Sequence, residues 1–326
     1  MNRIIPLLIL LTLCLASPAL AAMPVTVSIV PQQYFVEQIG GDLVDVSVMV
    51  QPGASPASYE PKPRQMAQLS KARIYFSIGV PFEAAWLDRI RSANEDMTVI
   101  AMDKNIDKLP MAEHHHHEEH ATEEHDDHHH EHEGHHEEHG HGHDTHGHGH
   151  DAHGHAEGHH GHNGIPDPHV WTAPPLVRVM AGTIRDALIN EDPQNQSVYE
   201  ANYETFVKKI DSVDAKLRAI FKDVGPHNRF MVYHPSWGYF AKTYGLTQIP
   251  IELEGKQPGP RELAELIQHA KNEGIHVIFV QPQFSEKSAQ LIAKAINGSV
   301  IKADPLAYDW PENLLKVGKG FKDALK

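Results

Sequence analysis

The chain has 326 residues and a net charge of −15, from 43 acidic and 28 basic residues. Fourteen of the acidic residues lie in residues 113–163, which contain no Lys or Arg, so the remaining 29 nearly balance the 28 basic residues. Because this balance leaves no basic stripe on the rest of the chain, the composition argues against a nucleic-acid partner.

The N-terminal residues have the pattern of a secretory signal peptide. A basic residue precedes the apolar run 4–15 and the small-residue sequence ASPALAA follows it, so we expect cleavage that removes residues 1–22. The run is shorter than the about 20 apolar residues of a membrane anchor. The only cysteine, Cys14, follows Leu13, whereas a lipid-attachment cysteine normally follows a small residue. We therefore expect an exported, soluble protein that is not a lipoprotein and has no disulfide or thiolate metal site.

Stretches rich in β-branched residues recur in the part of the chain before residue 113. They predict four strands, at 25–30, 44–50, 73–78 and 97–102. Between these strands, the amphipathic stretches RQMAQLSKA and PFEAAWLDRIRSA are typical of helices. The alternation of strand and helix favours a parallel sheet with helical crossovers.

The same alternation returns after a long helix. We expect helices at 174–190 and 193–222, the second with Asp192 as its N-cap. Further strands are predicted at 229–233, 247–251, 276–280 and 299–303, and further helices at 236–244, 260–273, 285–297 and 311–325. Together these patterns predict an α/β protein of two lobes, each with a four-stranded parallel sheet flanked by helices.

Residues 113–163 differ from the rest of the chain. They contain 23 of the 28 histidines, interleaved with Asp, Glu and Gly and with almost no apolar residue. Such a segment cannot bury enough surface to offset the entropy of ordering it, so we expect it to be disordered without metal. We interpret it as a metal-binding loop, because many weak imidazole sites beside one strong site raise the local metal concentration. The alternative is a solvated spacer with incidental affinity. The accessory ligands would include His114, His115, His116, His117, His141, His143, His146, His148 and His150.

Three residues with metal-ligating side chains stand where ligands collect in α/β proteins. His234 and Asp304 follow the fifth and eighth expected strands, and ligands bind outside the carboxyl ends of such strands. His169 stands where ordered structure resumes after the insert. Imidazole together with carboxylate suits zinc, with manganese or iron less favoured. The other histidines outside the insert follow no strand end and are interpreted as ordinary residues: His227, His269 and His276.

The motifs PGASPxxYEP, DPHVW, HPSWGYF, VIFVQPQFS and DPL occur in this order across the chain. In order and spacing, and with the His-rich insert among them, the sequence resembles the solute-binding proteins of bacterial zinc and manganese ABC transporters, in particular the zinc-binding subgroup with a His-rich loop. The resemblance implies two lobes joined by a long rigid helix, with one metal in the cleft between them. It also implies a periplasmic monomer that works with the membrane permease of an ABC transporter. The expected segments are a signal peptide (1–22), an N-terminal lobe (23–112) completed by residues 164–192, the His-rich loop (113–163), the linking helix (193–222) and a C-terminal lobe (223–326).

Carried over from this family, the metal ligands fall on His169, His234 and Asp304. The remaining family ligand is a histidine in the PGASPHxYEP loop, and it falls on Ala57, whose methyl group cannot coordinate a metal. Three replacements stay open: Glu60, a water molecule, or a histidine of the insert. The alternative is a site whose specificity is lost or altered.

The expected function is high-affinity capture of Zn²⁺ in the cleft and its delivery to an ABC permease, with the His-rich loop collecting metal. The sequence contains no HExxH motif and no evident nucleophile–base pair, so we do not expect an enzyme. Two other hypotheses remain: a periplasmic zinc buffer or chaperone without a dedicated transporter, and a metallohydrolase with an open water position on the three ligands.

Overall fold

The computed structural model describes residues 21–111, 165–252 and 256–325. The expected His-rich loop with its accessory histidines, and all but the last two residues of the expected signal peptide, lie outside the described residues. In the part of the chain that is described, no helix is long and apolar enough to cross a membrane.

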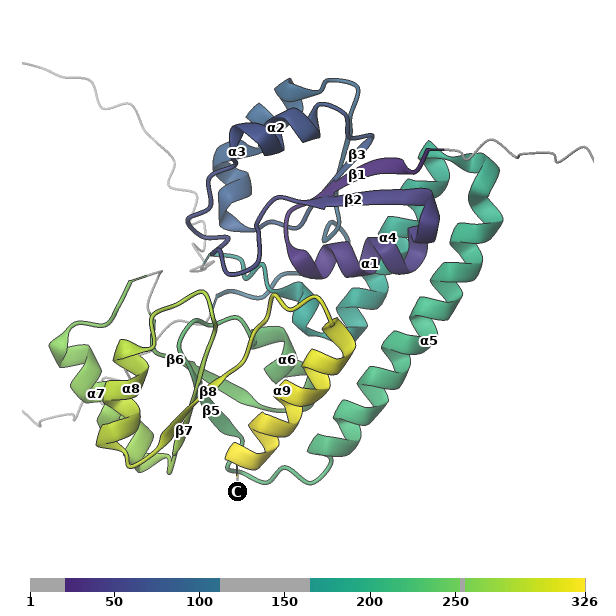
Figure 1. Cartoon of the computed structure of the whole chain (residues 1–326). Helices are drawn as coiled ribbons and strands as arrows, with labels where there is room; N and C mark the ends of the chain where they lie inside the picture. Colours follow the sequence, from purple (N-terminus) through teal and green to yellow (C-terminus); the bar gives the residue numbers. More distant parts are fainter. Residues whose placement is uncertain (1–20, 112–164, 253–255, 326) are drawn as a thin grey trace, which may run out of the picture. The chain divides into compact units, whose positions relative to one another are not determined.

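The N-terminal lobe is built on one parallel sheet (Figure 1). Its strands lie in the order β2-β1-β3-β4, with bounds β1 (Met23–Val27), β2 (Val44–Val48), β3 (Ile74–Ser77) and β4 (Thr98–Ala101). The register places Val25 opposite Val46 on one side and Ile74 on the other. All four residues of β3 are buried, because helices cover the faces of a parallel sheet. The helical elements of this lobe are α1 (Val30–Gly40), η1 (Gly41–Leu43), α2 (Pro63–Leu69), α3 (Pro81–Ala93), η2 (Val170–Thr172) and α4 (Pro174–Glu191).

The C-terminal lobe repeats this topology. Its parallel strands lie in the order β6-β5-β7-β8, with bounds β5 (Arg229–Val232), β6 (Thr247–Pro250), β7 (Val277–Val280) and β8 (Ser299–Lys302). Its helices are α6 (Gly238–Tyr244), α7 (Pro260–Asn272), α8 (Lys287–Ala295) and α9 (Trp310–Ala324). The eight strands confirm the expected fold of two lobes with four-stranded parallel sheets.

A single long helix connects the two lobes. Helix α5 (Gln196–Phe221) has 26 residues and is therefore about 39 Å long. It contacts α1 and α4 of the N-terminal lobe and α6 and α9 of the C-terminal lobe (Figure 1). It starts three residues later than expected, because a short turn, η3 (Pro193–Asn195), comes first. The side chain of Asp192 does not cap this helix but accepts hydrogen bonds from Asn195 and Tyr199.

Helix α1 is an element that the sequence patterns did not predict. The first strand was expected to extend to residue 30, whereas β1 ends at Val27 and α1 begins at Val30. Most residues of α1 are buried, including neighbours such as Tyr34, Phe35 and Val36. A helix that is covered on most sides lacks the polar face on which the helical period depends, so it cannot be recognised by amphipathicity.

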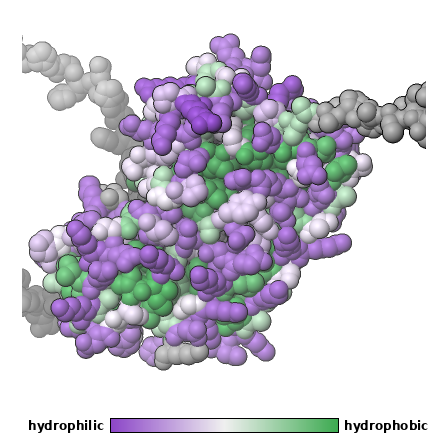
Figure 2. Space-filling view, viewed as in Figure 1, coloured by the Kyte–Doolittle hydropathy of each residue, from purple (hydrophilic) through white to green (hydrophobic). Residues whose placement is uncertain are grey.

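Buried apolar side chains form two clusters. The larger one continues from the N-terminal sheet through α4 and α5 to α6 and α9, and the smaller one lies between the C-terminal sheet and helices α7 and α8. The face drawn in Figure 2 is mainly hydrophilic, as expected when the apolar residues fill these clusters. The larger cluster therefore ties both lobes to the same framework.

Candidate metal centre

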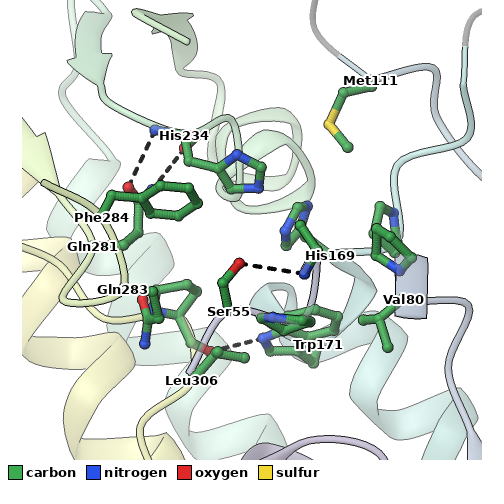
Figure 3. A pocket seen from close by; sticks show the side chains of 15 residues that line it. Ser55, Val80, Met111, His169, Trp171, His234, Gln281, Gln283, Phe284 and Leu306 are labelled. Carbon is green, nitrogen blue, oxygen red and sulfur yellow. Dashed lines mark hydrogen bonds between the residues drawn. The ribbon is translucent and has the colours of Figure 1, made fainter. Parts of the chain in front are cut away.

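The carboxyl ends of the strands of both lobes meet at a cavity of about 60 Å³, which has room for a metal ion with bound water (Figure 3). Three groups of residues line it. The N-terminal lobe supplies Ser55, Pro56, Ala57, Val80, Pro81 and Met111. The segment before α4 supplies Pro168, His169 and Trp171, and the C-terminal lobe supplies His234, Gln281, Gln283, Phe284, Pro305 and Leu306.

His169 is held by a carboxylate that lies two residues before it. Asp167 Oδ1 accepts a hydrogen bond from the backbone N–H of His169 at 2.9 Å and lies 2.7 Å from its ring Nδ1. Both residues are buried, Asp167 with only 1% of its surface exposed. Because Asp167 occupies Nδ1, the Nε2 atom of His169 is the ring nitrogen that remains for a metal.

His234 is held in the same way by residues far away in the sequence. Its backbone N–H donates to Gln281 Oε1 at 3.1 Å, and its carbonyl accepts from Gln281 Nε2 at 2.6 Å. Its ring Nδ1 lies 3.3 Å from Glu252 Oε1, and the ring stacks on Phe284. Burial lowers the pKa of His234, although Glu252 acts against this effect. The ring is therefore kept neutral, which is the form that binds a metal.

The two imidazole rings converge on the cavity. Their centroids are 5.2 Å apart and their planes are inclined at 73° (Figure 3). Each ring has a carboxylate at Nδ1, the arrangement that commonly orients histidine ligands of metals. The structure thus brings together two of the three ligands that the sequence predicts.

Asp304 lies directly behind the cavity wall. Its Oδ1 accepts hydrogen bonds from Gln283 Nε2 at 3.1 Å and from the backbone N–H of Leu306 at 2.9 Å. Gln283 and Leu306 both line the cavity, whereas Asp304 does not. Accordingly, no group of three or more His, Cys, Asp or Glu side chains is close enough to hold a metal among the residues described.

The loop that carries Ala57 also reaches the cavity. Ala57 is one of the lining residues, and its backbone N–H donates to Ser55 Oγ at 3.3 Å. Glu60 is exposed and is not among the lining residues. The neighbouring Tyr59 is buried instead and donates to Gln65 Oε1. The side of the cavity next to Ala57 therefore has no carboxylate or imidazole among the described lining residues.

The structure assigns supporting roles to residues that the sequence reasoning did not single out as site residues. Asp167, Gln281 and Gln283 hold His169, His234 and Asp304, respectively. Gln281 and Gln283 follow β7, so the rule that ligands collect at the carboxyl ends of strands could have found them. Asp167 stands in the DPHVW motif, two residues before the histidine.

The two chain ends that flank residues 112–164 are joined beside His169. Pro110 and Pro166 form an antiparallel bridge, and the backbone N–H of Met111 donates to the carbonyl of Ile165 at 2.8 Å. The Tyr239 hydroxyl of the C-terminal lobe donates to the Asp167 carbonyl at 2.9 Å and accepts from the N–H of the residue before Pro110. The His-rich segment therefore leaves and re-enters the fold at the edge of the candidate site.

Comparisons with known proteins agree with this fold and site. The model of the ZnuA family, described as the periplasmic component A of a zinc-uptake complex, matches residues 25–316. A crystal structure of ZnuA is 37% identical, covers 94% of this chain and 100% of its own, and has a TM-score of 0.76. The high-affinity zinc uptake system protein ZnuA of Bacillus subtilis (strain 168) is 27% identical over 91% of this chain and 82% of its own length. The iron-binding protein YfeA of Yersinia pestis is 23% identical over 84% of this chain and 75% of its own length.

Proposed function

The chain belongs to the ZnuA family of periplasmic zinc-uptake components, and from this membership we propose that it captures Zn²⁺ between its lobes and delivers it to the permease of an ABC transporter. The family consists of solute-binding proteins of transporters, not enzymes, which confirms the expectation that the chain is not an enzyme. Zinc is the finer part of the proposal, because one relative is an iron-binding protein.

The pair of buried imidazoles is the observation that carries the proposal. His169 and His234 each have one ring nitrogen next to a buried carboxylate, which leaves two Nε2 atoms for the metal. Imidazole suits zinc and also iron, whereas manganese is better served by oxygen ligands. We infer that Asp304 is the third ligand, because the groups that hold it, Gln283 and the Leu306 backbone, belong to residues of the cavity wall.

The fourth coordination position remains to be assigned. Zinc sites with three protein ligands commonly hold a water in the fourth position. An insert histidine is the other candidate, since both ends of the His-rich segment lie beside His169. Glu60 is disfavoured, because it is exposed and does not line the cavity. In either case the insert would collect zinc near the cleft, and the chain would act as an exported monomer.

The test is zinc titration of the full chain by calorimetry and chelator competition. His169→Ala and His234→Ala should each weaken the tight site by more than about 10- to 100-fold, the effect of losing only a supporting partner of a ligand. His269→Ala is the matched control, because His269 is exposed on α7. A tight site that survives both cleft substitutions would refute the assignment. A wild-type chain with many weak sites and no dominant one would favour a zinc buffer instead.

A further inference from the structure

The wall of the cavity that the N-terminal lobe supplies contains one sulfur atom. Among the lining residues of this wall, only Ser55 and Met111 have a heteroatom in the side chain. Ser55 Oγ already accepts a hydrogen bond from the backbone of Ala57. The thioether of Met111 is therefore the soft donor on the side of the cavity where Ala57 offers none.

The backbone of Met111 is fixed next to the strand that leads to His169. Its N–H donates to the Ile165 carbonyl at 2.8 Å, and the bridge between Pro110 and Pro166 precedes it. The side chain has three rotatable bonds and can adapt to a ligand. In Figure 3 it extends from its ribbon into the space above His169, across from His234.

The surroundings of this thioether favour a soft cation of low charge. Apolar side chains make up much of the cavity wall, including Val80, Trp171 and Phe284. Thioether and imidazole ligands select Cu(I), whereas a carboxylate adds to the preference for harder divalent ions. The carboxylate of Asp304 lies behind the C-terminal wall, on Gln283, and the thioether belongs to the N-terminal wall.

We propose that the cavity also binds a soft monovalent cation of the Cu(I) class, through His169, His234 and the thioether of Met111. This inference rests on the imidazole pair of the proposed zinc site and adds a second ligand set to it. Zn²⁺ uses the pair with the carboxylate of Asp304, and Cu(I) uses the pair with the thioether. The two metals compete for the imidazoles and differ in the third ligand.

The first experiment follows the Met111 methyl group by NMR in the full chain labelled with methyl-¹³C methionine. Ag(I) serves as the probe, because it is a soft monovalent ion without redox chemistry under these conditions. The 23 insert histidines also bind silver, but each methyl signal reports on its own residue. We expect Ag(I) to shift the Met111 signal, assigned with Met111→Leu, and to leave that of Met66 on α2 unchanged. A Met111 signal that does not move at silver saturation overturns the inference.

The second experiment separates the two ligand sets. Cu(I) affinity is measured under ascorbate by competition with a copper(I) chelator, and Zn²⁺ affinity by a zinc chelator. Met111→Leu should weaken Cu(I) binding by about tenfold or more and leave Zn²⁺ binding unchanged. Asp304→Asn should weaken Zn²⁺ binding and leave Cu(I) binding unchanged, and Met66→Leu should change neither.

Failure of this inference can be distinguished from failure of the proposed function. If Met111→Leu binds Cu(I) as tightly as the wild type, the thioether is not a ligand, although the zinc site stands. If the wild-type chain has no tight Zn²⁺ site at all, the proposed function fails whatever Met111 does. Circular dichroism of each variant checks that the fold is retained.

Discussion

Single residues that are not metal ligands set the position of the two histidines. Asp167 holds the ring of His169 through Oδ1, and its other oxygen faces the start of α6 in the C-terminal lobe. A Cβ atom at Gly238 would lie 2.9 Å from Asp167 Oδ2 and 3.4 Å from Gln248 Nε2. Since Gly238 does not have a positive φ, the need for glycine there comes from this close approach alone.

Gly238→Ala should therefore displace Asp167 and disturb the orientation of His169. We expect zinc binding to weaken by about 10- to 100-fold, as for other losses of a partner behind a histidine ligand. The measurement is chelator competition on the folded variant. Gly182→Ala in α4 is the control, because a Cβ there meets no atom within 4 Å. Equal zinc affinity of the Gly238 variant and the wild type would show that Asp167 does not depend on this approach.

At the scale of elements, the contact between α5 and α9 fixes the C-terminal sheet on the long helix. Gly318 of α9 allows the approach, since a Cβ there would lie 2.6 Å from Leu217 Cδ2. Phe321, one turn later, is fully buried and stacks on Phe230 of β5 at 4.2 Å. The small residue and the aromatic ring thus determine how closely α9 packs.

Two glycine substitutions in the same helix test this packing. Gly318→Ala should lower the free energy of unfolding by about 1–3 kcal/mol, the usual cost of overpacking. Gly320→Ala should leave it unchanged or raise it by up to about 1 kcal/mol, because its Cβ would be 3.6 Å from Phe279, an ordinary contact, and alanine favours helix. Denaturant unfolding of both variants measures the difference. The packing argument fails if the two substitutions have the same effect.

On the scale of the whole described fold, hydrogen bonds join the lobes around the cavity. Trp171 Nε1 donates to the Pro305 carbonyl at 2.7 Å, and Trp310 Nε1 donates to the Trp171 carbonyl at 2.8 Å. The hydroxyl of Tyr308 donates to Glu37 Oε2 of α1. These bonds, together with α5 and the shared apolar cluster, restrain the lobes against wide opening. Local movement of the loop after β8, which carries Asp304, is therefore the more accessible route for a metal.

Removal of residues 113–163 tests the roles of the cleft and the insert separately. The joined ends need to span little distance, since Pro110 and Pro166 already pair. We expect one tight zinc site to remain and the number of weak sites to fall, with the stability of the metal-free fold unchanged. Calorimetry combined with chelator competition measures both quantities. Loss of the tight site would instead identify an insert histidine as the ligand that replaces the missing one at Ala57.

The sequence by itself determined the two α/β lobes, because periodic apolar patterns and turn residues are local and specify strands and helices directly. It also placed His169, His234 and Asp304 at the carboxyl ends of strands or at the re-entry of the chain, and it showed the gap at Ala57. Local patterns could not show helix α1, whose residues are buried on most sides.

Only the tertiary structure decided how the site is assembled. The pairing of the two imidazoles, the position of Asp304 behind Gln283, and the approach of Met111 to the cavity depend on residues that are far apart in the chain. The hydrogen bond from His234 to Gln281 spans 47 positions, and that from Trp171 to Pro305 spans 134. Such contacts are set by the packing of whole elements against each other, and no period of two or 3.6 residues records them.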